Sequence, residues 1–377
     1  MAEDQLVIAG AGIAGLALAA GLRHAASPWS CVLLEERPAL GSTGGAITLW
    51  PAALAALDRI GVGGEVRALG HPVGAGSVRT HTGRALRTLD STRTADALGE
   101  PLLAVRRGEL IEALHVATGS AVIVYDAPVL GFEHTPGGVR VLTGSGAADA
   151  VEGTALVGAD GYRSRVARTL QPDLAESYAG FPAWRGLARV DGLDAVQVWG
   201  ARQEFGVVPL GRGEAYWFAT VREPPGGVLA ADPADELARL RAAFAGWPDP
   251  VLRVLDAAEP ATVSRNDVMD RAPLHTWRDG PVVVIGDAAH PMRPHLGQGG
   301  CQALLDAATL AEQLSLTPRP EQAFAAFEAR RRRTAGRVVR ASRAASRAVD
   351  APTAVHRLSA LVPDRVFLRA LAALAGS

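Results

Sequence analysis

The chain has no lysine, and all 38 of its basic residues are arginine. A lysine forms the Schiff base of pyridoxal phosphate enzymes and contacts the nucleotide phosphates in P-loop proteins. Both chemistries are therefore excluded.

Cysteine is also scarce. The two cysteines, Cys31 and Cys301, lie far apart and have neither metal-ligand spacing nor the number that a disulfide framework needs. We therefore expect a reducing, cytoplasmic location and no metal site. The uncharged run 5–22 follows acidic residues and is interrupted by Gly10, Gly12 and Gly15. It is therefore typical of neither a secretory signal nor a membrane span.

Neither sign of charge is in excess, since the formal net charge is -1. A near-neutral chain has no general attraction to nucleic acid or to acidic membranes. Arginines recur at intervals of three and four between 330 and 347, which is typical of a solvated helical face. We expect neither a nucleic-acid partner nor a membrane partner.

The chain begins with the pattern of a parallel sheet. Leu6 to Ala9 form an apolar strand, a glycine turn and an alanine-rich helix to about His24 follow, and Cys31 to Leu34 form a second strand. The apolar run 282–285 predicts another buried strand, and a helix is expected over about 300–314. The nucleotide-type domain therefore resumes late in the chain.

Between these pieces the pattern changes to short alternating runs at 73–89 and 184–221, with a helix over 235–244. We predict an α/β fold: a discontinuous Rossmann-like domain, an inserted antiparallel sheet domain and C-terminal helices. The expected boundaries are 1–70, 99–170 and 271–316 for the first domain, 71–98 and 171–270 for the second, and 317–377 for the helical segment.

The glycine turn has the spacing of a dinucleotide site. Gly10, Gly12 and Gly15 follow a strand and open a helix, and Glu35 ends the next strand 20 residues after Gly15. The first glycine permits the tight turn, the second admits a pyrophosphate, and the third lets helix and strand pack closely. The helix N-terminus stabilises the anion, and the Glu35 carboxylate can accept from a ribose hydroxyl. The alternative is a glycine turn without a ligand.

Two further motifs place an acid just beyond a strand: Val157 to Gly161 with Asp160, and Val283 to His290 with Asp287. The second continues with Pro294 and with Gly297 to Gly300, and so resembles the pattern G-D-A-A-H-x-x-x-P-x-x-G-Q-G. This pattern is specific to the flavoprotein aromatic hydroxylases, which share the p-hydroxybenzoate hydroxylase fold. Gly44 to Ile47, with Trp50 and Pro51, extend the resemblance to this family. Gly45 to Pro51, Tyr178 to Gly180 and Gly297 to Cys301 are similar to the FAD-dependent urate hydroxylases within it.

The resemblance implies that FAD is the cofactor. Glu35 would hold the adenosine ribose and Asp287 the ribityl chain, with Arg107 and Asp160 along the ribityl and pyrophosphate region. The residues it implies for FAD are Gly10, Gly12, Ala14, Gly15, Glu35, Glu36, Arg37, Gly45, Thr48, Arg107, Val129, Asp160, Asp287, Pro294, Gly297, Gln298, Gly299, Gly300 and Cys301. Two positions depart from the family pattern: Leu305 replaces a glutamate, and Cys301 replaces an asparagine found in many members.

The resemblance also implies the reaction. NADPH or NADH would reduce the flavin transiently, since the chain has no second dinucleotide motif. Molecular oxygen would form a flavin C4a-hydroperoxide that attacks a small aromatic or heteroaromatic substrate. The alternatives are a reductase or oxidase of the same fold and a non-catalytic FAD-binding protein, while a halogenase is disfavoured because its lysine is missing. The expected assembly is a monomer or homodimer.

The substrate pocket departs from the urate-type members. Their urate-binding asparagine, arginine and aspartate correspond to Ala183, Glu204 and His295, and only the pocket tyrosine, Tyr216, is retained. A bound urate would lose these partners, so we predict that urate is not the substrate.

Strand alternation adds Arg185 and Phe218 to the pocket face and turns Phe205 and Trp217 away. The predicted catalytic residues are Tyr216 and His295, and the predicted substrate-binding residues are Arg185, Glu204, Tyr216 and Phe218. Glu204 could pair with Arg185; otherwise its carboxylate would repel an anionic substrate, which favours a neutral or weakly basic ring. The alternative for each polar residue is a local hydrogen bond or exposure to solvent.

His290 and Cys301 each allow a catalytic interpretation. We expect His290 to order its loop rather than to transfer a proton. Cys301 stands near a helix start, which can lower a thiol pKa. A small packed residue is the favoured interpretation.

Overall fold

In a computed structural model, which describes residues 4–41, 45–144, 150–227, 230, 232–359 and 361–375, the N-terminal strand lies inside a six-stranded sheet. The strands in spatial order are β18 (Arg278–Asp279), β19 (Val282–Val284), β12 (Ala155–Gly158), β1 (Gln5–Ala9), β2 (Ser30–Leu34) and β8 (Val122–Val124). Every pair is parallel except β18 with β19. The sheet thus joins segments from four distant parts of the chain.

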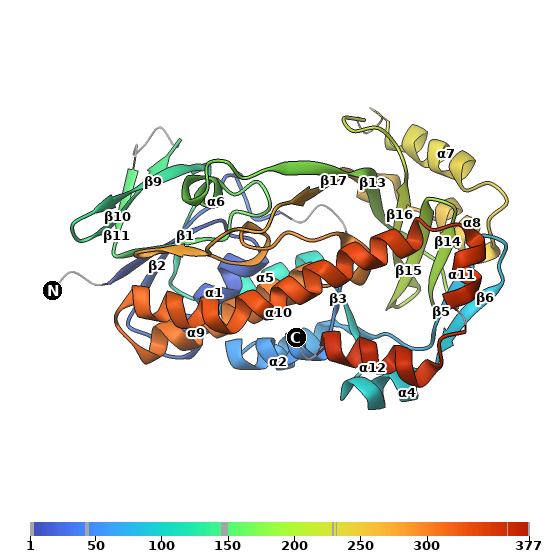
Figure 1. Ribbon diagram of the computed structural model, residues 1–377, viewed down its shortest axis with the longest axis horizontal. Coiled ribbons are helices and arrows are strands. Elements are labelled where there is room, and N and C mark those ends of the chain that lie inside the picture. The colour runs from blue at the N-terminus through green and yellow to red at the C-terminus, as the bar shows by residue number, and fades with distance from the viewer. Residues whose placement is uncertain are drawn as a thin grey trace.

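Helices cover this sheet because its central strands are apolar on both faces. The helices of this half are α1 (Ile13–His24), α2 (Pro51–Ile60), α3 (Gly63–Leu69), α5 (Arg107–Thr118), α6 (Arg165–Leu170) and α9 (Gly299–Leu316). Helix α9 packs against α1, α2 and the long helix α10 (Pro320–Val349). Figure 1 shows α10 running along the molecule from α9 toward strands β14 to β16 (Ala195–Gly200, Gln203–Gly211 and Glu214–Val221).

A seven-stranded sheet forms the other half of the molecule. Its order is β17 (Ser264–Arg271), β13 (Glu176–Arg189), β16, β15, β14, β5 (Gly76–Thr80) and β6 (Ala85–Leu89). The pairs are antiparallel as expected, except that β14 and β5 are parallel. Helices α7 (Pro233–Ala243) and α8 (Asp249–Asp256) cover one face and share a core with it.

Smaller elements complete the chain. They are α4 (Ser91–Leu98), the sheet of β3 (Ala46–Leu49), β7 (Leu103–Arg106) and β4 (His71–Pro72), the sheet of β9 (Val129–Thr135), β10 (Gly138–Thr143) and β11 (Ala150–Gly153), the short turns η1 (Pro260–Thr262), η2 (Gly286–Ala288) and η3 (Pro294–Leu296), and helices α11 (Thr353–Ser359) and α12 (Asp364–Ala375). The α/β class with an added sheet and C-terminal helices is confirmed. Among the described helices, none is long and apolar enough to cross a membrane.

Candidate functional site

The glycine turn after β1 leaves an open space at the start of α1. Gly10 has φ +98°, and a Cβ there would lie 2.6 Å from the carbonyl oxygen of Ala159. A Cβ on Gly15 would lie 2.0 Å from the carbonyl oxygen of Gly10, so only glycine allows α1 to pack this close to the turn. A Cβ on Gly12 would meet nothing within 4 Å. This unfilled space at a helix N-terminus suits an anionic pyrophosphate.

The Glu35 carboxylate closes this turn from the end of β2. It accepts hydrogen bonds from the backbone N–H of Ala11 at 2.8 Å and of Arg37 at 3.2 Å. These bonds hold the half-buried side chain beside the glycine turn, where a ribose would lie. Glu36 and Arg37 are exposed next to it.

Asp160 lies opposite, just beyond β12. Its Oδ2 accepts from the backbone N–H groups of Arg165 at 2.7 Å and Val166 at 3.3 Å, at the start of α6. Its Oδ1 is buried and has no hydrogen-bond partner. Burial raises the pKa of this carboxyl, although the hydrogen bonds oppose the shift. Within the described residues this oxygen is thus an unpaired acceptor enclosed by protein atoms.

Asp287 and Arg107 carry opposite charges toward the same region. Both side chains are accessible to solvent, although dense protein around them affects their charge. Burial raises the pKa of Asp287, while His290 and Arg107 oppose the shift. Burial likewise lowers the pKa of Arg107, which interacts electrostatically with Asp287, Arg185 and Tyr216. Groups assigned to the ribityl chain and to the substrate are thus brought together.

The start of α9 forms the next part of the wall. Gly297 has φ +61° and precedes the first helical turn, where Gly299 and Gly300 lie. The Nε2 of the buried Gln298 has no partner. Free amides at the start of this 18-residue helix favour negative charge.

Cys301 is fully buried, and its thiol donates to the carbonyl oxygen of Thr48 at 3.4 Å. Burial raises the pKa of this thiol to about 12, which favours the interpretation of Cys301 as a small packed residue. The carbonyl oxygen of Gly45, which precedes β3, accepts from the backbone N–H of Arg107 at 3.0 Å. This bond connects the start of β3 to the start of α5.

The other predicted FAD residues lie on neighbouring elements. Ala14 is in α1, Val129 is buried at the start of β9, and Pro294 begins η3. Gly44, which belonged to one of the matching motifs, lies outside the described residues.

His290 belongs to a buried network that holds the loop after β19. Its Nε2 lies 2.5 Å from Asp306 Oδ2, and the same oxygen accepts from the backbone N–H of Gly286 at 2.9 Å. Arg331 donates to Asp306 Oδ1 at 2.7 Å and to Gln302 at 2.6 Å. His290 therefore orders the Asp287 loop, as expected.

Arg331 corrects the interpretation of the arginine series as a solvated face. It is only 5% exposed and neutralises a fully buried aspartate. The sequence spacing could have indicated this burial. Arg331 recurs at intervals of three and four with apolar residues that share the buried face of α10, namely Phe324, Phe327, Ala335 and Val338.

The predicted pocket residues share one face of the seven-stranded sheet. Cross-strand partners project to the same side, and Arg185 pairs with Phe218, while Tyr216 occupies the next position along β16 on that face. Arg185 lowers the pKa of Tyr216 by charge and hydrogen bonding, but burial outweighs this and raises it. The rings of Phe205 and Trp217 stack on the opposite face, with centroids 5.8 Å apart.

Glu204 and His295 lie on the pocket side but away from solvent. Their side chains are 2% and 3% exposed, and Glu204 Oε2 is 3.7 Å from His295 Nε2. Burial raises the pKa of Glu204 to about 8 and lowers that of His295 to about 4, so both are neutral near pH 7. The predicted pairing of Glu204 with Arg185 is not found within the described residues, where the ion contact of Glu204 is to His295.

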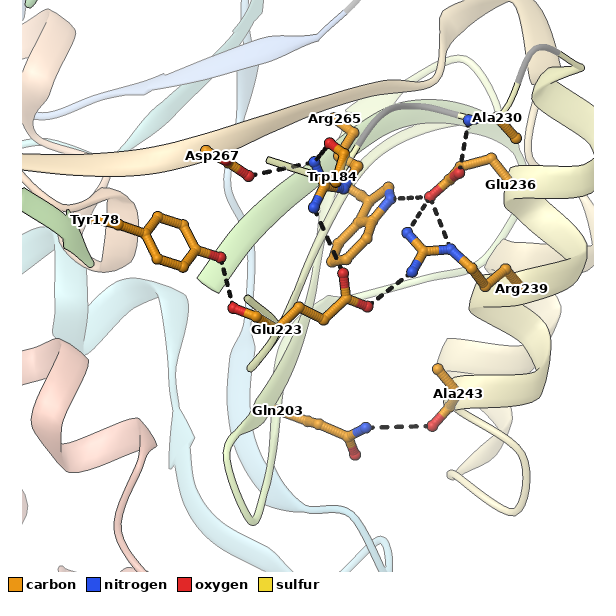
Figure 2. Close-up of polar contacts among 11 residues, drawn as sticks. Tyr178, Trp184, Gln203, Glu223, Ala230, Glu236, Arg239, Ala243, Arg265 and Asp267 are labelled. Atoms are coloured by element: carbon orange, nitrogen blue, oxygen red, sulfur yellow. Dashed lines mark hydrogen bonds and ion pairs between the residues drawn. The ribbon is translucent and has the colours of Figure 1, made fainter. Parts of the chain in front are cut away.

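Helix α7, which covers the opposite face of the sheet, carries a different buried carboxylate, Glu236. It accepts from Trp184 Nε1 at 2.5 Å, from the backbone N–H of Ala230 at 3.0 Å and from Arg239 (Figure 2). Arg239 also bonds Glu223 at 2.8 Å and stacks over the Trp184 ring at 4.9 Å. Every polar atom of this carboxylate is thus satisfied, in contrast to Glu204.

The arrangement therefore consists of a nucleotide cradle beside an aromatic and cationic pocket face. The described residues contain no group of three or more His, Cys, Asp or Glu side chains placed to hold a metal ion.

Comparisons with known proteins agree with this geometry. A family model described as FAD binding domain matches residues 3–342. The aurachin C monooxygenase/isomerase of Stigmatella aurantiaca is 36% identical over 328 residues, which cover 86% of this chain and 84% of that protein. The FAD-dependent urate hydroxylase of Mycolicibacterium vanbaalenii is 30% identical over 348 residues, 89% of this chain and 87% of that protein.

The chain spans about half of the zeaxanthin epoxidase of Prunus armeniaca, with 33% identity over 82% of this chain and 48% of that protein. Among solved structures, Klebsiella pneumoniae HpxO complexed with FAD and uric acid has a TM-score of 0.90 at 24% identity. That match covers 99% of this chain and 97% of HpxO, and it supports the fold.

Proposed function

Because the chain belongs to the FAD binding domain family and is an FAD-dependent monooxygenase, we propose that it hydroxylates a small aromatic or heteroaromatic substrate with NADPH or NADH and molecular oxygen. The observation that carries the proposal is that Arg107, beside the cofactor cradle, interacts electrostatically both with Asp287 and with Arg185 and Tyr216 on the sheet. A substrate on that sheet face would lie next to the cofactor.

The residues present fit FAD. The open space at Gly12 and the Glu35 carboxylate suit the adenosine and pyrophosphate, and Asp160 Oδ1 is an unused acceptor. Asp287 and Arg107 would hold the ribityl region, and the start of α9 would stabilise negative charge on the ring. When bound, FAD would supply the redox chemistry: it can be reduced by the nicotinamide and can then activate oxygen.

The pocket face favours an electron-rich, anionic ring such as a phenolate. Arg185 and Arg107 supply positive charge beside Tyr216, and Phe218 lies 6.2 Å from Tyr216 between ring centroids. Glu204 is neutral at pH 7 because burial raises its pKa to about 8. We therefore propose an anionic ring in place of the neutral or weakly basic ring expected from the sequence, because a neutral Glu204 would not repel an anion.

Within this proposal, Tyr216 and Arg185 contact the substrate and hold its oxygen by hydrogen bonds. The buried Glu204 and His295 pair lies behind that surface and shapes it without contacting solvent. Excluding water here matters because it limits loss of activated oxygen as peroxide.

The test is to incubate the purified protein with NADPH or NADH and a panel of phenols, in air and under nitrogen. We expect a phenol to speed flavin reduction and to yield an oxygenated product only in air. Tyr216→Phe and Arg185→Gln should lower kcat/KM at least tenfold, because each removes a hydrogen bond to a charged or ionising group. Tyr178→Phe is the matched control, since the Tyr178 hydroxyl donates to the carbonyl oxygen of Glu223.

The other outcomes separate the alternatives. NAD(P)H consumption that yields only peroxide with every phenol would indicate an oxidase or reductase. A yellow protein that NAD(P)H does not reduce would indicate a non-catalytic flavoprotein, and a colourless protein that cannot be reconstituted with FAD would refute the proposal.

A further inference from the structure

A cavity beside α10 has a lining rich in arginine. Its volume is about 620 Å³, and it lies between α10, the segment after β17 and the loop after η2. The charged residues of the wall are six arginines without a single aspartate or glutamate: Arg271, Arg332, Arg333, Arg337, Arg340 and Arg343. This volume lies in the range of small-ligand sites.

Some of these arginines have protein partners. Arg343 bonds the Asp270 carboxylate at 2.6 Å, and Arg332 bonds Glu328 at 3.4 Å and the carbonyl oxygen of His275. These guanidinium groups are therefore partly neutralised at one side of the cavity.

The remaining α10 arginines are not neutralised. Arg333, Arg337 and Arg340 are exposed and make no ion pair within the described part of the chain. Their spacing of four and three places them on one helical face, and like charges at this spacing destabilise a helix. A bound anion would remove that repulsion.

Arg271 gives independent evidence of an unmet ligand. It is only 4% exposed and lines the cavity, and its Nε has no hydrogen-bond partner. Its other nitrogens donate to the carbonyl oxygens of Tyr162 at 3.1 Å and of Ala288. Burial lowers its pKa to about 10, which leaves it charged at neutral pH.

This arginine also links the cavity to the cofactor loop. Ala288 directly follows Asp287, and His290 from the same loop lines the cavity with Trp277, whose ring centroid is 5.1 Å away. An anion against Arg271 would therefore change the surroundings of the loop that carries Asp287.

We propose that the arginine cavity binds the phosphate groups of a nucleotide. Guanidinium groups match phosphate oxygens in both charge and geometry, and four of the six arginines have no competing carboxylate among the described residues. The nicotinamide dinucleotide carries such a diphosphate, and its identification as the occupant rests on the proposed function. A free nucleotide that acts as a regulator is the other source of the same chemistry.

The test measures binding of ADP and inorganic pyrophosphate to the FAD-loaded protein by calorimetry at low salt. We expect Arg337→Ala and Arg340→Ala each to weaken binding about tenfold, since each removes a charged hydrogen bond. Arg347→Ala is the matched control, because Arg347 is exposed on the same helix but does not line the cavity. Unchanged thermal unfolding, and the same loss in Arg340→Gln, would exclude misfolding as the cause.

The kinetic arm identifies the source. If the occupant is the reductant, KM for NADPH or NADH rises about tenfold in Arg337→Ala with kcat unchanged. If ADP binding falls but KM does not change, the site takes a free nucleotide and the reductant is rejected as its occupant. The proposal would be overturned if the protein bound neither ADP nor pyrophosphate, or if the cavity variants and Arg347→Ala bound ADP with equal affinity. ADP binding needs no turnover, so this result is independent of whether the protein hydroxylates a phenol.

Discussion

Glu204→Gln should make the protein more stable at alkaline pH. Glu204 is 1% exposed, its Oε1 has no hydrogen-bond partner, and the nearest ionisable group, His295, is neutral. Burial raises its pKa from 4.5 to about 8. An amide of the same shape removes the charge that the folded state resists.

The magnitude follows from linkage. The folded pKa lies above the unfolded value, so the contribution of Glu204 to stability is fully present below pH 4.5 and is lost as pH rises to about 8. A shift from 4.5 to about 8, at ~1.36 kcal/mol per unit, is on the order of 5 kcal/mol as an upper limit. The low pKa of His295 gives the opposite slope at acid pH, but it is present in both proteins and cancels in the difference.

The assay is urea unfolding with excess FAD from pH 5 to pH 9. We expect the free energy of unfolding of Glu204→Gln to rise relative to that of the wild type as the pH increases to 8. Above pH 8 the difference should level off. Glu236→Gln is the control on the other face of the sheet, where hydrogen bonds hold the pKa of Glu236 low despite its burial (Figure 2). The free energy of unfolding of Glu236→Gln should be about 1.5 to 3 kcal/mol lower than that of the wild type at pH 7. A Glu204→Gln difference independent of pH, or a less stable variant at pH 8, would refute the reasoning.

Three further changes test the site. Asp287→Ala should weaken FAD binding by about 1.5 to 3 kcal/mol in a flavin titration, because the ribityl hydrogen bond is charge-assisted, whereas Cys301→Ser should bind FAD nearly as the wild type does; equal losses would contradict the assigned roles. Asp306→Asn should lower the free energy of unfolding by about 3 to 5 kcal/mol, since it leaves Arg331 buried without a counter-charge, while Glu312→Gln at an exposed pair with Arg330 should change it by less than about 1 kcal/mol. Urate should neither speed NAD(P)H oxidation nor be hydroxylated, because Ala183, Glu204 and His295 offer no matched partners; rapid urate turnover in a product assay would contradict this.

The cofactor cradle was predictable because its parts are local in sequence. A tight turn needs Gly10 in a left-handed conformation, and a helix start follows at once, so the geometry is determined within a few residues. Strand alternation likewise turned Phe205 and Trp217 away from the pocket, since successive side chains on a strand point to opposite faces.

Long-range packing decided what the sequence alone did not. The parallel pairing of β5 with β14 joins segments more than a hundred residues apart, and the contact of Glu204 with His295 depends on where η3 lies against the sheet. Arg331 is buried because α10 packs on α9 and brings it to Asp306, although its neighbours in sequence are exposed. Local periodicity determines which face a side chain occupies, but only the tertiary structure determines what covers that face, and therefore whether a charged group there is solvated, paired or neutralised.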